Sequence, residues 1–151
     1  LSMTYCRQYN RIFVLFSWAC YTRVTVTLTP YKERKNMNLI ANILTGIVAL
    51  LHFGFLYLEM FLWDKPRGRK SFRMTEEFAK QSKPLAMNQG LYNGFLAAGL
   101  IWGIFAGDAV KIFFLSCVII AGIFGAMTVS KRIFYMQAAP AILALVVLLV
   151  F

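Results

Sequence analysis

The chain of 151 residues is 60% apolar and 15% charged, whereas soluble domains average about 45–50% apolar and about 25% charged residues. These figures exclude a disordered chain and a disulfide scaffold, and they leave no room for a second sizeable soluble domain. A net charge of +10 would suggest nucleic-acid binding in a soluble protein. Here the basic residues lie between apolar runs, so we expect a small all-α membrane protein that does not bind nucleic acid.

Residues 1–36 carry six basic residues and one acidic residue. Their longest apolar stretch, residues 12–20, is shorter than the roughly 20 residues that a helix needs to cross a bilayer. Three interpretations stay open: a cleaved signal sequence, a basic amphipathic arm, or leader sequence before a natural start at Met37. We favour the third, because residues 32–37 can be encoded by a purine-rich string that contains a ribosome-binding site before a start codon.

Four apolar runs beyond this segment are long enough to span a membrane as helices. Their ranges are 38–63, 89–105, 110–129 and 133–151. Turn-forming residues separate them, and Pro140 lies inside the last run, where a transmembrane helix tolerates proline with a bend. The sequence thus predicts one domain over residues 37–151, folded as a four-helix transmembrane bundle.

The connection over residues 64–88 is long and holds seven basic and three acidic residues. Basic residues concentrate in cytoplasmic loops, so we expect the first and third connections to be cytoplasmic and the protein to lie in the plasma membrane. Thr75 before Glu76 and Glu77 predicts a helix start. A surface helix over residues 76–87 and a solvated loop remain equal alternatives. Membrane lipids are the expected partners, with the basic loop near anionic headgroups.

Polar residues follow a regular pattern in the first span. Asn38, Thr45, His52 and Glu59 are each seven residues apart. Seven steps of about 100° return to within about 20° of the starting direction, so all four lie on one stripe of the helix. Because polar groups are costly in hydrocarbon, this stripe is expected to face the other helices.

Glu59 lies one turn from the cytoplasmic end of its span, and the second and fourth spans begin on that side. We therefore expect one intramembrane polar cluster, with His52 about 10 Å deeper than Glu59. Its members are His52, Glu59, Gln89, Tyr92, Asn93 and Gln137. Two interpretations stay open. The cluster either binds or passes a small polar solute or proton, or it holds helices together through hydrogen bonds of roughly 0.6 to 2 kcal/mol each. In the second case Glu59 would pair with Lys131 or Arg132.

Small residues four positions apart predict close helix contacts. The glycines concerned are Gly90, Gly94, Gly99 and Gly103 in the second span and Gly122 and Gly125 in the third. We expect these two helices to cross closely. The alternative, that one such face forms a homo-oligomer, stays open.

The chain has one histidine, and no serine shares its span, so no nucleophilic catalytic constellation is evident. His52 and Glu59 lack a third ligand for a metal site, and no glycine-rich phosphate loop follows a strand. We expect no metal and no cofactor. An enzyme that uses Glu59 and His52 as acid and base on a lipid-phase substrate is the less favoured alternative.

Several motifs resemble one known family. They are LEMFLW at 58–63, PRGRK at 66–70, Phe72, NQGLYNGFLAAGL at 88–100, Gln137 and Pro140-Ala141. Residues 37–151 resemble the bacterial family of small membrane proteins catalogued as domain of unknown function 1304. The resemblance implies a four-helix protein of the bacterial plasma membrane and agrees with a start at Met37. It implies no activity, because the family carries no established biochemistry.

Overall fold

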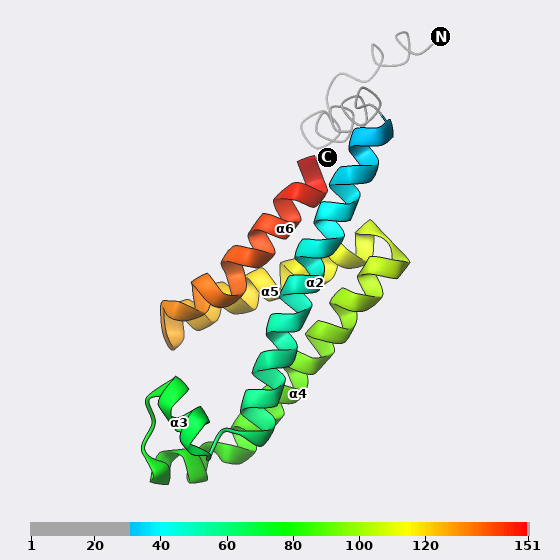
Figure 1. Ribbon diagram of the computed structural model, residues 1–151. Helices are drawn as coiled ribbons and strands as arrows, with labels where there is room; N and C mark the ends of the chain where they lie inside the picture. Colours follow the sequence, from blue (N-terminus) through cyan, green and yellow to red (C-terminus); the bar gives the residue numbers. More distant parts are fainter. Residues whose placement is uncertain (1–30, 151) are drawn as a thin grey trace, which may run out of the picture.

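The computed structural model describes residues 31–150, and this part of the chain consists of helices joined by short turns, without a strand. The elements are α2 (Tyr31–Phe61), α3 (Pro66–Phe72), α4 (Glu76–Ala106), α5 (Asp108–Thr128), η2 (Phe134–Ala138) and α6 (Ala139–Val150) (Figure 1). The predicted all-α class is confirmed. The three interpretations of residues 1–36 concern a segment of which residues 1–30 lie outside the described residues.

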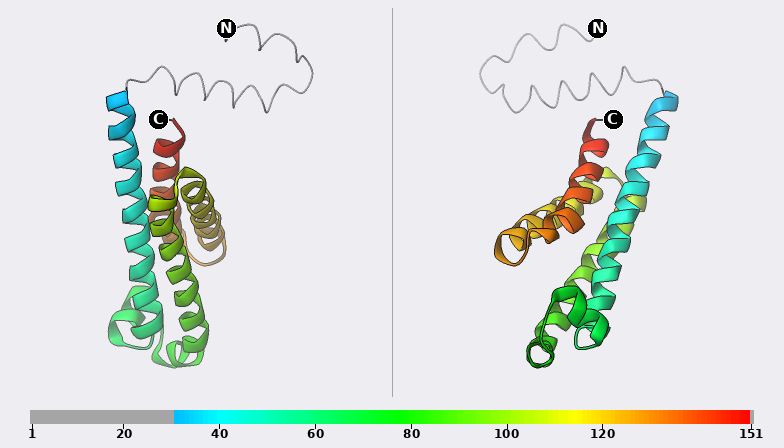
Figure 2. Two further views of the ribbon diagram at one scale, coloured as in Figure 1. Left: turned by 90° about the vertical axis from the view of Figure 1, so that its right-hand side faces the viewer. Right: turned by 60° about the vertical axis from the view of Figure 1, so that its left-hand side comes forward.

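Two helical hairpins make up the fold. Helices α2 and α4 run antiparallel side by side, and α5 and α6 form a second hairpin against them (Figures 1 and 2). One end of the fold holds the α4–α5 turn at Gly107, and we call it the Gly107 end. The opposite end holds α3, and we call it the α3 end. The turn between α5 and η2 stops short of the α3 end (Figure 2).

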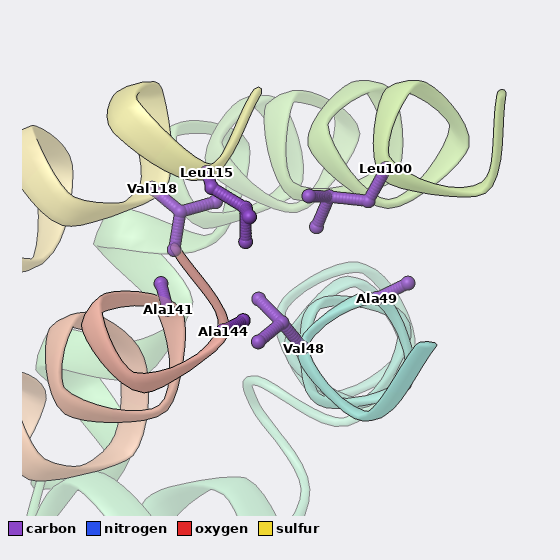
Figure 3. Close-up of a cluster of buried hydrophobic side chains, with 7 residues drawn as sticks. All are labelled: Val48, Ala49, Leu100, Leu115, Val118, Ala141 and Ala144. Atoms are coloured by element: carbon purple, nitrogen blue, oxygen red, sulfur yellow. The ribbon is translucent and has the colours of Figure 1, made fainter. Parts of the chain in front are cut away.

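The core lies where the two hairpins meet, and small side chains dominate it (Figure 3). Its buried members are Val48, Ala49, Leu100, Leu115, Val118, Ala141 and Ala144. Alanine lets helix backbones approach closely, so the helices are held together by dispersion contacts between their backbones and small side chains.

The second apolar run belongs to a longer helix that begins inside the basic connection. Residues 76–87 are helical, as one of the two alternatives held, and they continue without a break into the predicted second span as α4. Helix α4 starts where the sequence predicts: the Thr75 hydroxyl oxygen accepts a hydrogen bond from the Phe78 backbone N–H at 3.3 Å.

The fourth apolar run, in which the sequence predicts a bend at Pro140, contains the π-helical segment η2, which ends two residues before this proline. Proline has no N–H to donate, and its ring crowds the carbonyl four residues earlier. A wider π turn in front of the ring relieves that crowding.

Within the described range, two helices are long and apolar enough to cross a membrane, Lys35–Phe61 and Asp108–Thr128. The apolar helix over Phe134–Val150 is shorter. Helix α4 does not meet the same criterion, because glycine and polar side chains interrupt its apolar residues.

Candidate functional site

The polar stripe of α2 points into the fold over most of its length. Thr45 and His52 are fully buried, Glu59 is half-buried, and Asn38 is exposed. The Thr45 hydroxyl donates to the Ala41 carbonyl of its own helix at 2.8 Å, so its polar group is satisfied locally. The positions that remain for contacts with other groups are those of His52 and Glu59.

Glu59 meets Asn93 across the α2–α4 interface. The Asn93 amide nitrogen donates to Glu59 Oε2 at 2.7 Å, and Asn93 is only 5% exposed. Gly90 makes this approach feasible, because a Cβ there would lie 2.7 Å from Met60 Cγ and 3.2 Å from Glu59 Cβ. The expected alternative, an ion pair of Glu59 with Lys131 or Arg132, does not form between the side chains of the described range.

His52 presents an unsatisfied nitrogen to the interior. Its Nδ1 lies 2.8 Å from the Val48 carbonyl oxygen, so Nδ1 must carry the hydrogen and donate. A neutral ring then has Nε2 as a bare acceptor, and this atom is buried without any hydrogen-bond partner within residues 31–150. A buried polar atom without a partner is energetically unfavourable, so Nε2 is available to any hydrogen-bond donor that enters the bundle.

The other predicted members of the cluster do not join it. Gln89 is exposed and Tyr92 is 53% exposed, because α4 turns Gly90 and Asn93 toward α2 and leaves these two on its outer side. Gln137 lies in η2, half-buried, and forms no side-chain hydrogen bond within the part of the chain described. The expectation of one six-residue cluster is therefore wrong for Gln89, Tyr92 and Gln137.

A polar site that the sequence did not reveal lies near the Gly107 end. Lys111 of α5 is 3% exposed, and its ammonium nitrogen donates to Asn42 Oδ1 at 2.8 Å and lies 2.9 Å from Asp108 Oδ1. Gly103 leaves room for it, since a Cβ there would lie 2.9 Å from Lys111 Cγ. The sequence feature that could have indicated this site is Asn42, which lies three residues before Thr45 and therefore near the polar face of α2.

The glycines divide among three interfaces. Gly99 contacts the Phe114 ring and Gly103 contacts Lys111, so these two admit α5. Gly90 and Gly94 instead contact α2, through residues including Leu56, and Gly122 and Gly125 contact η2 and the residue before it. The expected close crossing of the second and third spans thus involves Gly99 and Gly103, whereas the other glycines pack against different helices.

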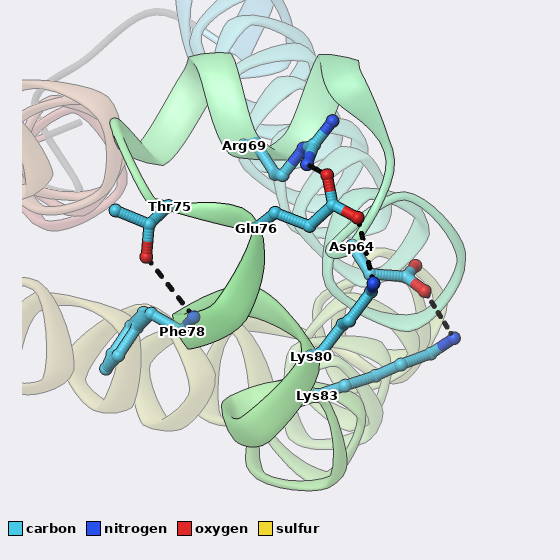
Figure 4. Close-up of polar contacts among 7 residues, drawn as sticks. All are labelled: Asp64, Arg69, Thr75, Glu76, Phe78, Lys80 and Lys83. Carbon is cyan, nitrogen blue, oxygen red and sulfur yellow. Dashed lines mark hydrogen bonds and ion pairs between the residues drawn. The ribbon is translucent and has the colours of Figure 1, made fainter.

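A network of ionic contacts fastens the α3 end (Figure 4). Glu76 pairs with Arg69 and, at 2.8 Å, with Lys80, and Asp64 pairs with Lys83 at 2.9 Å. The hydrogen bonds from Lys80 and Arg69 lower the pKa of Glu76 to about 2. The hydrogen bond from Lys83 likewise lowers the pKa of Asp64. Both carboxylates therefore stay ionised at neutral pH and join the start of α4 to the residues that follow α2.

No group of three or more His, Cys, Asp or Glu side chains that could hold a metal ion occurs in the described part of the chain. The candidate site therefore consists of organic hydrogen-bonding groups. It comprises the Glu59–Asn93 pair and, deeper in the fold, His52 Nε2.

Comparisons with known proteins concern the same region. The sequence profile of a family described as "Protein of unknown function (DUF1304)" matches residues 46–149, which include His52, Glu59 and Asn93. The uncharacterized protein YpaA of Lactococcus lactis subsp. lactis is 35% identical over 115 residues, which are 73% of this chain and 97% of the relative. No solved structure matches.

Proposed function

The chain belongs to the DUF1304 family, and we propose that it is an integral protein of the bacterial plasma membrane. In this proposal α2, α4, α5 and the η2–α6 helix cross the bilayer as a four-helix bundle. Two long apolar helices and a bacterial relative support it. So do large apolar side chains on the outside of the bundle, such as Phe105 at 83% and Met127 at 81% exposed, because lipid would solvate them where water would not.

The α3 end faces the cytoplasm in this arrangement. The segment over residues 64–88, which includes α3, carries seven basic residues against three acidic ones. Basic residues within short loops are retained on the cytoplasmic side during insertion. Glu59 and Asn93 then lie near the cytoplasmic end of the bundle, and His52 lies about 10 Å further in along α2.

We propose further that this polar interior binds or passes a small polar solute or proton from the cytoplasmic side. The observation that carries the proposal is His52 Nε2, a fully buried acceptor without a donor among residues 31–150. Most buried side-chain polar atoms in proteins have a hydrogen-bond partner, so an unpartnered Nε2 is unusual for a histidine that serves packing alone. A transient donor, whether water, a hydroxyl or an ammonium group, would satisfy Nε2 at the moment of binding.

A second candidate function is structural. The Asn93–Glu59 bond joins α2 to α4, and the Lys111–Asn42 bond joins α5 to α2. Interhelical hydrogen bonds of this kind stabilise membrane bundles without any ligand. Under this alternative the polar residues hold helices in place for a partner or for a second copy of the chain.

Flux through proteoliposomes discriminates between the two. The probes are protons, followed with an enclosed pH-sensitive dye, and glycerol and urea, followed by light scattering. The variants are Glu59→Gln and His52→Phe, and the matched control is Glu77→Gln, which alters an exposed carboxyl group on α4. We expect at least one probe to pass the wild type, and both site variants to lower its flux about tenfold or more while the control does not.

Folded yield separates the alternatives further. His52→Phe removes the unpartnered Nε2 together with the Nδ1 bond to the Val48 carbonyl and keeps a ring against Phe55, whose centroid is 5.7 Å away, so its folded yield is measured beside its flux. A large loss of folded protein in Glu59→Gln, together with no flux of any probe in the wild type, would contradict the binding proposal and support the structural alternative.

A further inference from the structure

The basic segment at the α3 end contains two kinds of cation. Three are engaged in ion pairs: Arg69 and Lys80 with Glu76, and Lys83 with Asp64 (Figure 4). The other four are exposed and form no ion pair with any side chain of the described range. These are Lys65, Arg67, Lys70 and Arg73. The paired cations fasten the segment to the fold, whereas the unpaired ones leave their charge available to a partner.

The segment that carries these cations is fixed to the two long helices. Gly68 is buried against the end of α2, where a Cβ would lie 2.8 Å from the Trp63 carbonyl oxygen. The Trp63 ring packs on Phe72, with centroids 4.7 Å apart, and its indole N–H donates to Ser82 of α4 at 3.0 Å. Helix α3 is therefore held in a defined position and presents its outer side chains in a defined arrangement.

Two of the four unpaired cations, Arg67 and Lys70, lie on α3 itself, and Arg73 lies at its C-cap. Arg67 and Lys70 are three residues apart and thus neighbours on one helix face, away from the buried Gly68. Arg73 follows at the C-cap in a left-handed conformation with φ 54°, where glycine would be unstrained. Three positive side chains thus lie close together in the chain without an ionic partner in residues 31–150, and such a concentration of charge attracts anions.

We propose that this surface, Arg67, Lys70 and Arg73, binds the phosphodiester headgroup of an anionic phospholipid. The inference rests on the membrane insertion proposed above. A lipid fits better than a free phosphate because the same end of the fold exposes apolar side chains, Phe78 and Leu85 of α4. The surface also follows directly on the apolar helix Lys35–Phe61, at the depth where headgroups lie.

Trp63 is a built-in reporter for this site, because it packs against α3 through Phe72. The double variant Trp18→Phe/Trp102→Phe leaves Trp63 as the remaining tryptophan. It is reconstituted in phosphatidylcholine vesicles that contain either brominated phosphatidylglycerol or brominated phosphatidylcholine, and quenching of fluorescence is titrated. We expect brominated phosphatidylglycerol to occupy the site at least about fivefold more strongly, which is the effect of a single basic residue at an anionic surface.

Charge-matched variants test whether the preference belongs to α3. Arg67→Gln/Lys70→Gln should reduce it to less than about twofold, whereas Lys131→Gln/Arg132→Gln, which removes the same charge elsewhere, should retain it. Equal quenching by both lipids in the parent protein would overturn the inference, and so would an equal loss of preference in the control. Should the double variant fold poorly, the single variants Arg67→Gln and Arg73→Gln alter exposed side chains and must each lower the preference.

A second reporter separates this inference from the membrane proposal. Trp102 of α4 is 60% exposed, and in the variant Trp18→Phe/Trp63→Phe it is the remaining tryptophan. Quenching of Trp102 by brominated phosphatidylcholine reports insertion, regardless of headgroup charge. If Trp102 is quenched and Trp63 shows no headgroup preference, only the lipid site is overturned. If neither tryptophan is quenched, the membrane proposal itself fails.

Discussion

The Glu59–Asn93 contact gives the sharpest test of the α2–α4 interface. Asn93→Ala removes a hydrogen bond of 2.7 Å and leaves a half-buried carboxyl group without its donor. Interhelical hydrogen bonds in membranes contribute about 0.6 kcal/mol on average and about 1.7 kcal/mol at most. Leaving the buried partner unpaired costs about 1–3 kcal/mol, and the better helix propensity of alanine offsets about 0.5 kcal/mol of the loss. The free energy of unfolding should therefore fall by about 1–2 kcal/mol.

Asn88→Ala is the matched control. Asn88 lies on the same helix, is exposed, and forms no side-chain hydrogen bond within the described range. The same atoms are deleted, so the control reports helix propensity alone and should raise the free energy of unfolding by about 0.5 kcal/mol. The difference between the two variants isolates the contact with Glu59.

The assay is unfolding by sodium dodecyl sulfate in mixed micelles, followed by circular dichroism. A double-mutant cycle with Glu59→Ala should give a coupling energy of about 1 kcal/mol, because both side chains belong to one contact. Equal stability of Asn93→Ala and Asn88→Ala, or a coupling energy within about 0.3 kcal/mol of zero, would refute the reasoning and mean that α2 and α4 do not meet at these residues.

Three further predictions concern other parts of the molecule. Gly68→Ala should speed trypsin cleavage at the basic segment about tenfold or more, because its Cβ would collide with the backbone carbonyls of Leu62 and Trp63 and detach α3. Gly54→Ala, with no atom within 4 Å of the added Cβ, should leave cleavage unchanged. Lys111→Met should lower the free energy of unfolding by about 1–3 kcal/mol, because it leaves Asn42 unpaired. Adding Asn42→Leu to this variant should restore most of the lost stability. Equal stability of the single variant and the wild type would contradict the buried contact. Glu76 has a pKa of about 2, below the ordinary value of 4.5, so its ion pairs stabilise the loop fully above about pH 4.5 and are lost as the pH falls toward 2. Carboxyl NMR at low salt should show a titration midpoint of Glu76 near 2 in the wild type and a midpoint closer to 4.5 in Arg69→Gln/Lys80→Gln. A wild-type midpoint near 4.5 would count against the pairing.

Local patterns in the sequence were enough to predict the long helices and one polar face, but not the short helix α3. Apolar run lengths indicated where helices lie, and Thr75 marked the start of α4 through its side-chain cap. Pro140 marked the irregular turn that η2 contains. These features depend on neighbours within a few residues, so they can be read without knowledge of the fold. The motifs at 58–63 and 88–100 likewise indicated the family whose profile matches residues 46–149.

The positions of the polar residues across the fold could not be read in the same way. Helical periodicity places residues on the faces of their own helix, but it does not fix the rotation and tilt of the neighbouring helix. Asn93 therefore meets Glu59 whereas Gln89, one turn away on α4, faces outward. Gln137 misses the cluster because its segment, η2, packs mainly against α5.

The sequence by itself determined that this protein is helical, where α4 is followed by α5 and α5 by η2, and that α2 carries an inward polar stripe, because each of these follows from interactions between residues close in the chain. Only the tertiary structure decided that Lys111 is buried against Asn42, that His52 Nε2 has no partner among residues 31–150, and that the basic segment divides into paired and unpaired cations. These outcomes depend on which helices approach one another, and the small residues at each interface set how closely they do so.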